Sequence, residues 1–188
     1  MLVLDTSVVL NLLASGRSRF LLKNMPSQVI VPAAVIREVT REPPLASELG
    51  GALEPLLAAG LLTKVEPSDE QVEIALELAG APAPDNLDDG EAYAIALAAN
   101  LNATIGVDER KARRIILKRW PTLPRHFTIE LFRIAAQRGA MEEADYADLV
   151  FSALRFARMR IPNEYRSEII KLIGIERARV CPSLGVFR

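Results

Sequence analysis

Four acidic side chains stand at positions from which predicted strands and helices could direct them to one place. Asp5 ends the opening apolar run of the chain, and Asp108 ends a second apolar run. Both runs are typical of buried parallel strands. Ligands of open α/β sheets bind in the crevice outside the carboxyl ends of the strands, so we expect the two aspartates to face one crevice. Glu38 and Glu91 lie on predicted helices nearby.

Clustered carboxylates need a counter-charge. Each acid taken singly has an ordinary explanation as a helix cap or as a partner of a helix dipole. If the fold brings them within a few ångströms, each close pair costs about 4 kcal/mol at an effective dielectric constant of about 20. Oxygen ligands without histidine or cysteine favour Mg²⁺ or Mn²⁺ over Zn²⁺. The four acids are therefore candidates for a Mg²⁺ or Mn²⁺ site.

Strand patterns alternate with helical patterns along most of the chain. This alternation predicts a three-layer α/β/α fold, with a parallel sheet of four or five strands and helices on both faces. Beyond residue 139 only helices are expected. Strands are expected at about 1–5, 29–31, 61–65, 103–107 and 125–127, and helices at about 7–14, 18–24, 33–40, 45–59, 68–79, 89–100, 109–119, 129–138, 142–158 and 163–173.

Several polar residues are expected to cap these helices. Thr6 or Ser7 is predicted to cap the first helix, and Thr128 the helix that begins at about residue 129. Asp88 or Asp89 is predicted to cap the helix that carries Glu91. Each of these residues therefore has a structural role that competes with any role in chemistry.

The bulk composition indicates one domain in a reducing compartment. A chain of 188 residues, half of them hydrophobic, is long enough for one sizeable core. Its one cysteine, Cys181, cannot form an intrachain disulfide, so a cytoplasmic location is expected. The N-terminus lacks the basic region of a signal peptide, and no apolar run approaches the roughly 20 residues that span a bilayer.

The net charge of −1 conceals two halves of opposite sign. Residues 1–100 carry 6 Lys and Arg against 14 Asp and Glu, whereas residues 101–188 carry 17 against 10. The basic residues Arg110, Lys111, Arg113 and Arg114 crowd the helix that follows Asp108. They are predicted to contact the phosphates of a nucleic acid. The alternative is an ordinary solvated helix face.

Four blocks of sequence resemble the PIN domain ribonucleases, in particular a prokaryotic branch of that family. The blocks are Leu-Val-Leu-Asp-Thr-Ser at 2–7, Val-Ile-Arg-Glu-Val at 35–39, Leu-Asp-Asp-Gly-Glu-Ala at 87–92 and Ile-Gly-Val-Asp at 105–108. Their order and spacing match the family over residues 1–138. The resemblance implies a PIN-like nuclease domain over 1–138, followed by a helical extension over 139–188 that packs on the same domain.

The resemblance also implies an activity and a site. Asp5, Glu38, Glu91 and Asp108 would bind Mg²⁺ or Mn²⁺, and RNA would be hydrolysed to leave a 5′-phosphate and a 3′-hydroxyl. Asp88 is an accessory candidate, and Thr6 or Ser7 could hold a metal-bound water. The expected partners are RNA, an antitoxin or another inhibitory protein, and a second copy of the chain in a homodimer, because the protein could be the toxin of a toxin–antitoxin pair.

One departure from the family pattern keeps an alternative open. Many PIN nucleases carry a further acid about four residues beyond the equivalent of Asp108, and this chain has Ala112 there. A catalytically silent PIN-like module that binds RNA or protein is therefore the main alternative. A receiver-like binding domain is a third interpretation. The absence of paired aspartates after the first strand argues against it.

Overall fold

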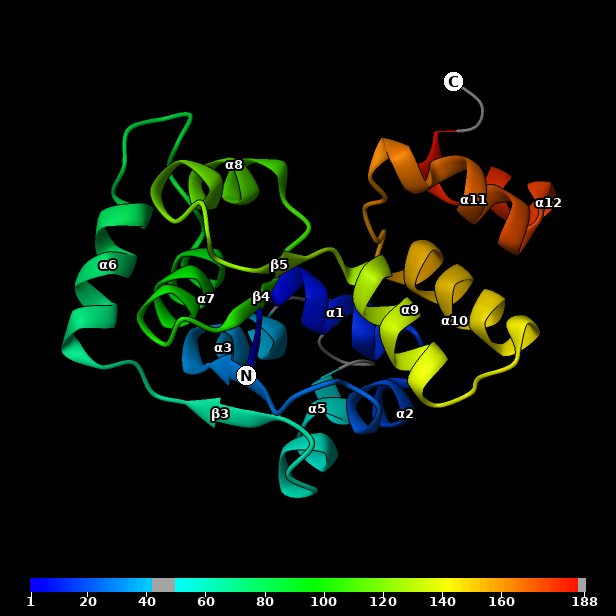
Figure 1. Ribbon diagram of the computed structural model, residues 1–188, viewed down its shortest axis with the longest axis horizontal. Helices are drawn as coiled ribbons and strands as arrows, with labels where there is room; N and C mark the ends of the chain where they lie inside the picture. The colour runs from blue at the N-terminus through cyan, green and yellow to red at the C-terminus, as the bar shows by residue number, and fades with distance from the viewer. Residues whose placement is uncertain (42–49, 186–188) are drawn as a thin grey trace.

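A parallel sheet occupies the centre of the protein (Figure 1). The computed structural model describes residues 1–41 and 50–185, and within them the sheet has five strands in the order β3-β2-β1-β4-β5. Every pairing is parallel, which confirms the predicted architecture. The strands are β1 (Leu2–Leu4), β2 (Val29–Pro32), β3 (Thr63–Val65), β4 (Thr104–Gly106) and β5 (Arg125–His126).

The register of β1 and β4 places two of the candidate acids at one edge of the sheet. Leu4 lies opposite Gly106, and the amide of Asp5 donates a hydrogen bond of 3.2 Å to the Gly106 carbonyl. Asp108 follows two residues after β4. The carboxyl ends of adjacent parallel strands therefore bring Asp5 and Asp108 to the same side of the molecule, as the sequence predicts.

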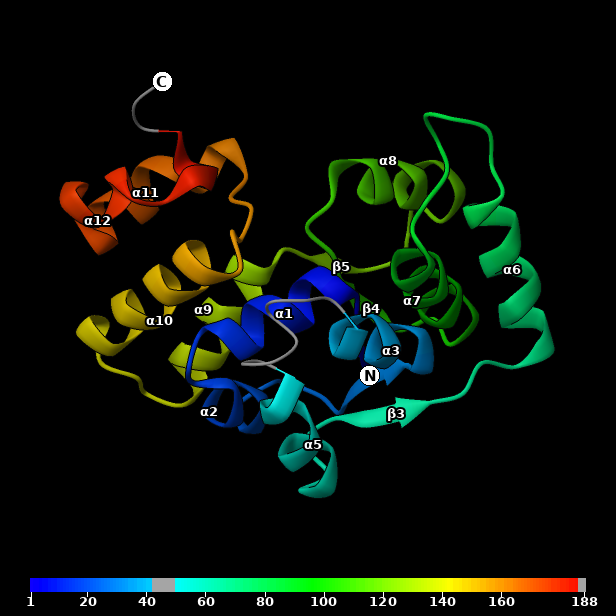
Figure 2. The same cartoon turned by 180° about the vertical axis from the view of Figure 1, so that it is seen from behind.

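Helices cover both faces of the sheet (Figures 1 and 2). Side chains alternate along β1, so Leu2 and Leu4 enter one hydrophobic core while Val3 enters the other. The helices are α1 (Thr6–Ala14), α2 (Ser18–Lys23), α3 (Ala33–Arg41), α5 (Gly50–Ala58), α6 (Asp69–Ala79), α7 (Asp89–Asn100), α8 (Arg110–Arg119), α9 (Thr128–Arg138), α10 (Glu143–Phe156), α11 (Asn163–Ile173), α12 (Ile175–Arg179) and the 3-10 turn η1 (Pro182–Leu184).

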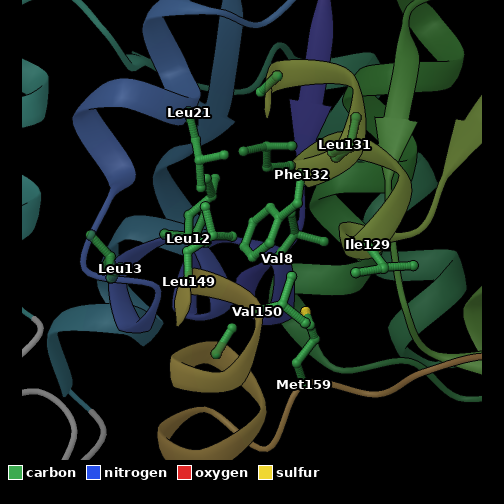
Figure 3. Close-up of a cluster of buried hydrophobic side chains, with 14 of the residues drawn as sticks. Val8, Leu12, Leu13, Leu21, Ile129, Leu131, Phe132, Leu149, Val150 and Met159 are labelled. Carbon is green, nitrogen blue, oxygen red and sulfur yellow. The ribbon is translucent and has the colours of Figure 1, made fainter. Parts of the chain in front are cut away.

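The larger core lies between α1, α9 and α10. Phe132 of α9 is fully buried there, and Figure 3 shows its ring among Val8 and Leu12 of α1 and Leu149 of α10. Helix α10 thus packs in the same core as the first helix of the chain. Met159, just beyond α10, is also buried in this cluster.

The smaller core holds the helices that carry the other candidate residues. Ala75 and Leu78 of α6, the alanine-rich face of α7, and Ile115 and Ile116 of α8 pack there. Ala112 is fully buried in the same cluster. The position of the missing family acid is therefore occupied by a packing residue.

Two of the predicted helix caps are wrong. Asp5, not Thr6 or Ser7, is the residue that caps α1, because its carboxylate accepts the Val8 amide. Thr128 is the first residue inside α9, and Phe127 precedes it. In both cases a polar side chain that resembled a simple cap makes a longer-range contact.

The predicted boundaries of the helices need smaller corrections. The start of the helix expected at 45–59 lies outside the described residues, and α5 runs from Gly50 to Ala58. The helix α12 and the turn η1 were not predicted. No helix in residues 1–41 or 50–185 has the length and apolar character needed to cross a membrane.

Candidate active site and basic cleft

Asp5 is completely buried at the start of α1. Its Oδ1 accepts hydrogen bonds from the Val8 amide at 2.8 Å and from the Ser7 hydroxyl at 2.9 Å. Its Oδ2 is also buried and has no hydrogen-bond partner among the described residues. The pKa of Asp5 is raised from 3.8 to about 8, chiefly by burial and next by the negative charge of Asp108. An orphaned carboxylate oxygen of this kind is suited to a cation.

Asp108 is held rigidly by groups that are distant in sequence. The Thr128 amide donates to its Oδ1 at 2.7 Å, and the Thr128 hydroxyl donates to its Oδ2 at 2.6 Å. Asn11 adds a bond of 2.9 Å to the same Oδ2. Burial raises the pKa of Asp108 to about 6, although the Thr128 hydrogen bonds oppose the shift. The carboxylate is therefore fixed in position.

Glu38 reaches the site from α3. Its Oε1 accepts the Gly90 amide at 2.8 Å, and its Oε2 accepts the Thr6 hydroxyl. A Cβ atom at position 90 would collide with the side chains of both Glu38 and Thr6, so these two side chains can keep their present positions only beside a glycine. Glu38 is thus hydrogen-bonded to Thr6, which follows Asp5, and to Gly90, which precedes Glu91.

Glu91 lies in the first turn of α7 and is half-buried. Its Oε2 accepts the amide of Asp88, the residue that precedes the helix, at 3.4 Å. Burial raises the pKa of Glu91, whereas the charges of Lys111 and Arg160 lower it. The charge of Glu91 in turn raises the pKa of Asp5. Asp88 is exposed and is the N-cap residue of α7, where it forms a capping box with Glu91.

The structure brings the four acids to one edge of the sheet without closing them into a cage. Asp5, Asp108 and Glu91 interact through their charges, while Glu38 is engaged by Thr6 and Gly90. Among residues 1–41 and 50–185, no three Asp, Glu, His or Cys side chains are arranged to hold a metal ion. The donor set is nevertheless all oxygen and includes the orphaned Asp5 Oδ2. Its chemistry fits Mg²⁺ or Mn²⁺.

A cleft of about 930 Å³ opens beside Asp108. Among the residues that the structure describes, seven arginines and two acidic residues line it. Arg110, Arg113 and Arg114 come from α8, and Arg125 comes from β5. The remaining three, Arg158, Arg160 and Arg166, come from the chain after α10. A cleft with this excess of positive charge attracts polyanions.

Three of the four predicted RNA-binding residues, Arg110, Arg113 and Arg114, line this cleft, and the fourth, Lys111, lies near the acids. Lys111 does not line the cleft, although its charge acts on Glu91. Arg113 is fixed, since its guanidinium donates 3.0 Å to the Val107 carbonyl and lies 3.4 Å from the centre of the Phe127 ring. Arg114 forms an ion pair with Asp85.

Two supporting residues were missed by the sequence analysis. Asn11 and Thr128 orient Asp108, yet they lie 97 and 20 residues from it in the chain. One signal was present for Asn11, because it interrupts the apolar helix Thr6–Ala14 and is buried there. A buried amide requires a hydrogen-bonding partner.

Comparison with known proteins assigns the chain to a family. The family model described as "DUF3368: PIN domain" matches residues 1–175. This range includes the four acids and the seven arginines that line the cleft. No curated protein and no solved structure matches the chain. The chain therefore belongs to the PIN domain family, whose members are generally nucleases.

Proposed function

We propose that the protein is a Mg²⁺- or Mn²⁺-dependent endoribonuclease. The observation that supports this most strongly is the buried Asp5 Oδ2, which has no hydrogen-bond partner in the described part of the chain and lies beside a second buried aspartate. Uncompensated buried charge is expensive unless an ion or a proton neutralises it. Asp108 also lines the basic cleft, so the acids and the candidate substrate surface are continuous.

Different residues would have different roles in phosphodiester hydrolysis. Asp5, Glu38, Glu91 and Asp108 would hold the ion, which supplies an activated water and neutralises charge on the phosphate. Thr128 and Asn11 keep Asp108 in place. The accessory candidates Thr6 and Ser7 orient carboxylates through their hydroxyls.

The basic residues would bind and orient the substrate. Arg113 offers a guanidinium that is already fixed by Val107 and Phe127, so little conformational freedom is lost when it contacts a phosphate. Arg110 and Arg114 extend the same wall of the cleft. Lys111 lies where its charge acts on Glu91.

A second candidate function is a catalytically silent module that binds RNA or protein. The observation in its favour is that the described acids are not arranged as a metal cage, and that Ala112 is packed in the core. Such a module would retain the basic cleft and would not cut. A role as the toxin of a toxin–antitoxin pair, with an antitoxin or a second copy as partner, stays a prediction, as does a cytoplasmic location.

The decisive experiment incubates the purified protein with a mixed RNA pool in Mn²⁺, with and without a chelator. The parent should cut only when Mn²⁺ is free, and Asp108→Asn should not cut. Asp148→Asn is the matched control, because Asp148 forms an exposed ion pair with Arg177 far from the acids in sequence. RNA that stays intact with the folded parent in Mn²⁺ would favour the silent module.

A further inference from the structure

The linker between α10 and α11, residues 157–162, directs two arginines toward solvent while two of its apolar side chains are buried in the core. Met159 and Ile161 are buried, and the alternating residues Arg158 and Arg160 are exposed and line the cleft. Arg158 has a φ of 55°, in the left-handed region that favours glycine. The chain thus has an arginine at a position where glycine would adopt the backbone conformation with less strain. Strained residues of this kind are associated with functional sites.

Arg160 connects this segment to the acidic site. It forms an ion pair with Glu109, the residue next to Asp108. Its positive charge also acts on the carboxylates of Asp108 and Glu91, where it opposes the rise in pKa that burial causes. The linker therefore reaches the acids from the side of the cleft opposite α8.

The cleft has two basic walls that come from distant parts of the chain. Arg110 and Arg113 of α8 form one wall, and Arg158, Arg160 and Arg166 form the other. Both views place α8 and α11 on either side of the molecule, with α1 and β5 between and below them (Figures 1 and 2). Arg166 is held in place by a bond of 3.1 Å to the Ser183 carbonyl, so the end of the chain supports this second wall.

We propose that the linker and α11 form the second wall of a track for single-stranded nucleic acid, and that Arg158 and Arg160 contact its backbone. The inference rests on the proposed function and adds a second set of residues that contact its substrate. A volume of about 930 Å³ lies within the range of roughly 300–1,000 Å³ that small ligands occupy, so the cleft admits a few unpaired nucleotides. Duplex RNA is instead recognised across an open surface that spans about 16 base pairs.

The test measures binding in a chelator, so that no cutting is needed for the readout. Arg158→Gly removes one cation and relieves the left-handed backbone, so its melting temperature should equal or exceed that of the parent. Its affinity for a single-stranded RNA should fall about fivefold at 0.1 M salt, and the slope of log affinity against log salt should fall by about 0.7. Arg158→Lys should retain the parent's values. Arg160→Gln should lower the affinity and the salt slope to a similar extent.

Controls separate this inference from the proposed function. Lys171→Gln changes an exposed cation of α11 that does not line the cleft, and it should alter neither affinity nor slope. Single-stranded RNA and single-stranded DNA should bind more tightly than duplex RNA of the same sequence. Equal affinity for the duplex, or unchanged binding by Arg158→Gly in a protein that still cuts RNA, overturns the inference and leaves the proposed function standing. Binding that follows these expectations without any cutting supports the track and refutes the enzyme.

Discussion

The buried Asp5 carboxylate makes the stability of the protein depend on pH. Its pKa is raised from 3.8 to about 8, chiefly by burial. The folded protein therefore retains a proton that the unfolded chain releases. The stability contributed by this group is complete below pH 3.8 and is lost as the pH rises through about 8.

Asp5→Asn should remove this pH dependence. In a chelator at pH 8, the variant should melt above the parent by about 4 °C or more, the shift that corresponds to 1–2 kcal/mol for a chain of this length. At pH 4 the two proteins should melt at similar temperatures. Thermal melts across this range check the prediction, with Asp148→Asn as a control. If Asp5→Asn melts below the parent at pH 8, the carboxylate is a structural cap and the charge cluster is unimportant.

Gly90 should position Glu38 for catalysis. A methyl group at this position would push the Glu38 carboxylate and the Thr6 hydroxyl away, although alanine is the better residue for a helix. Because a displacement of about 1 Å in an active site can reduce the rate by about a hundredfold, Gly90→Ala should lose cleavage by that order. Its melting temperature should change little, because the displaced atoms are the ends of flexible side chains. Full activity in Gly90→Ala would show that Glu38 is not needed at its present position.

Asp5, Asp108 and Glu91 could be proposed from the sequence because each follows a strand or lies in the first turn of a helix, whereas Glu38, inside α3, was proposed from its sequence block alone. Their supporting contacts could not be proposed in this way. Thr128 was interpreted as a cap because its place before a helix gives no sign of its contact with Asp108. Asn11 holds the same carboxylate across 97 positions of the chain. Contacts of this kind depend on how the elements pack, which local patterns do not encode.

At the scale of elements, the strands and most helices follow directly from hydrophobic period and turn residues. The end of α10 is the clearest exception, since the expected helix over 142–158 stops at Phe156. Met159 and Ile161 are buried in the core, and Arg158 adopts a left-handed conformation where the chain leaves the helix. Tertiary packing therefore decided this boundary against the local helical pattern.

The packing of α9 between α1 and α10 should dominate the stability of the larger core. Among residues 1–41 and 50–185, Phe132 has the largest fully buried side chain, and Phe156 at the end of α10 is 63% exposed. Phe132→Ala should lower the free energy of unfolding by about 3–5 kcal/mol, because it removes apolar contacts and leaves a cavity. Phe156→Ala is the control and should change it by less than about 0.5 kcal/mol. Denaturant titrations of the two variants make the comparison, and equal effects would contradict this description of the core.

At the scale of the whole molecule, we propose that the helices after residue 139 are part of the single core. Leu149, Val150, Ala153 and Leu154 of α10 are buried in the same cluster as the first strand and helix. A chain that ends at Arg138 would expose all of this surface. It should therefore lose cooperative thermal unfolding, as circular dichroism would show. A cooperative melt of residues 1–138 near the parent's temperature would instead mark the extension as a separable unit.

Calorimetric titration with Mn²⁺ tests whether Asp5, Glu38, Glu91 and Asp108 form one divalent-cation site, and it needs no knowledge of the RNA target. The parent should bind Mn²⁺ in a saturable manner, and its affinity should fall steeply in Asp5→Asn and in Asp108→Asn. Asp148→Asn, with its exposed carboxylate removed, should bind as the parent does. Parent-like Mn²⁺ binding by both active-site variants, or no binding by the folded parent, would contradict the account.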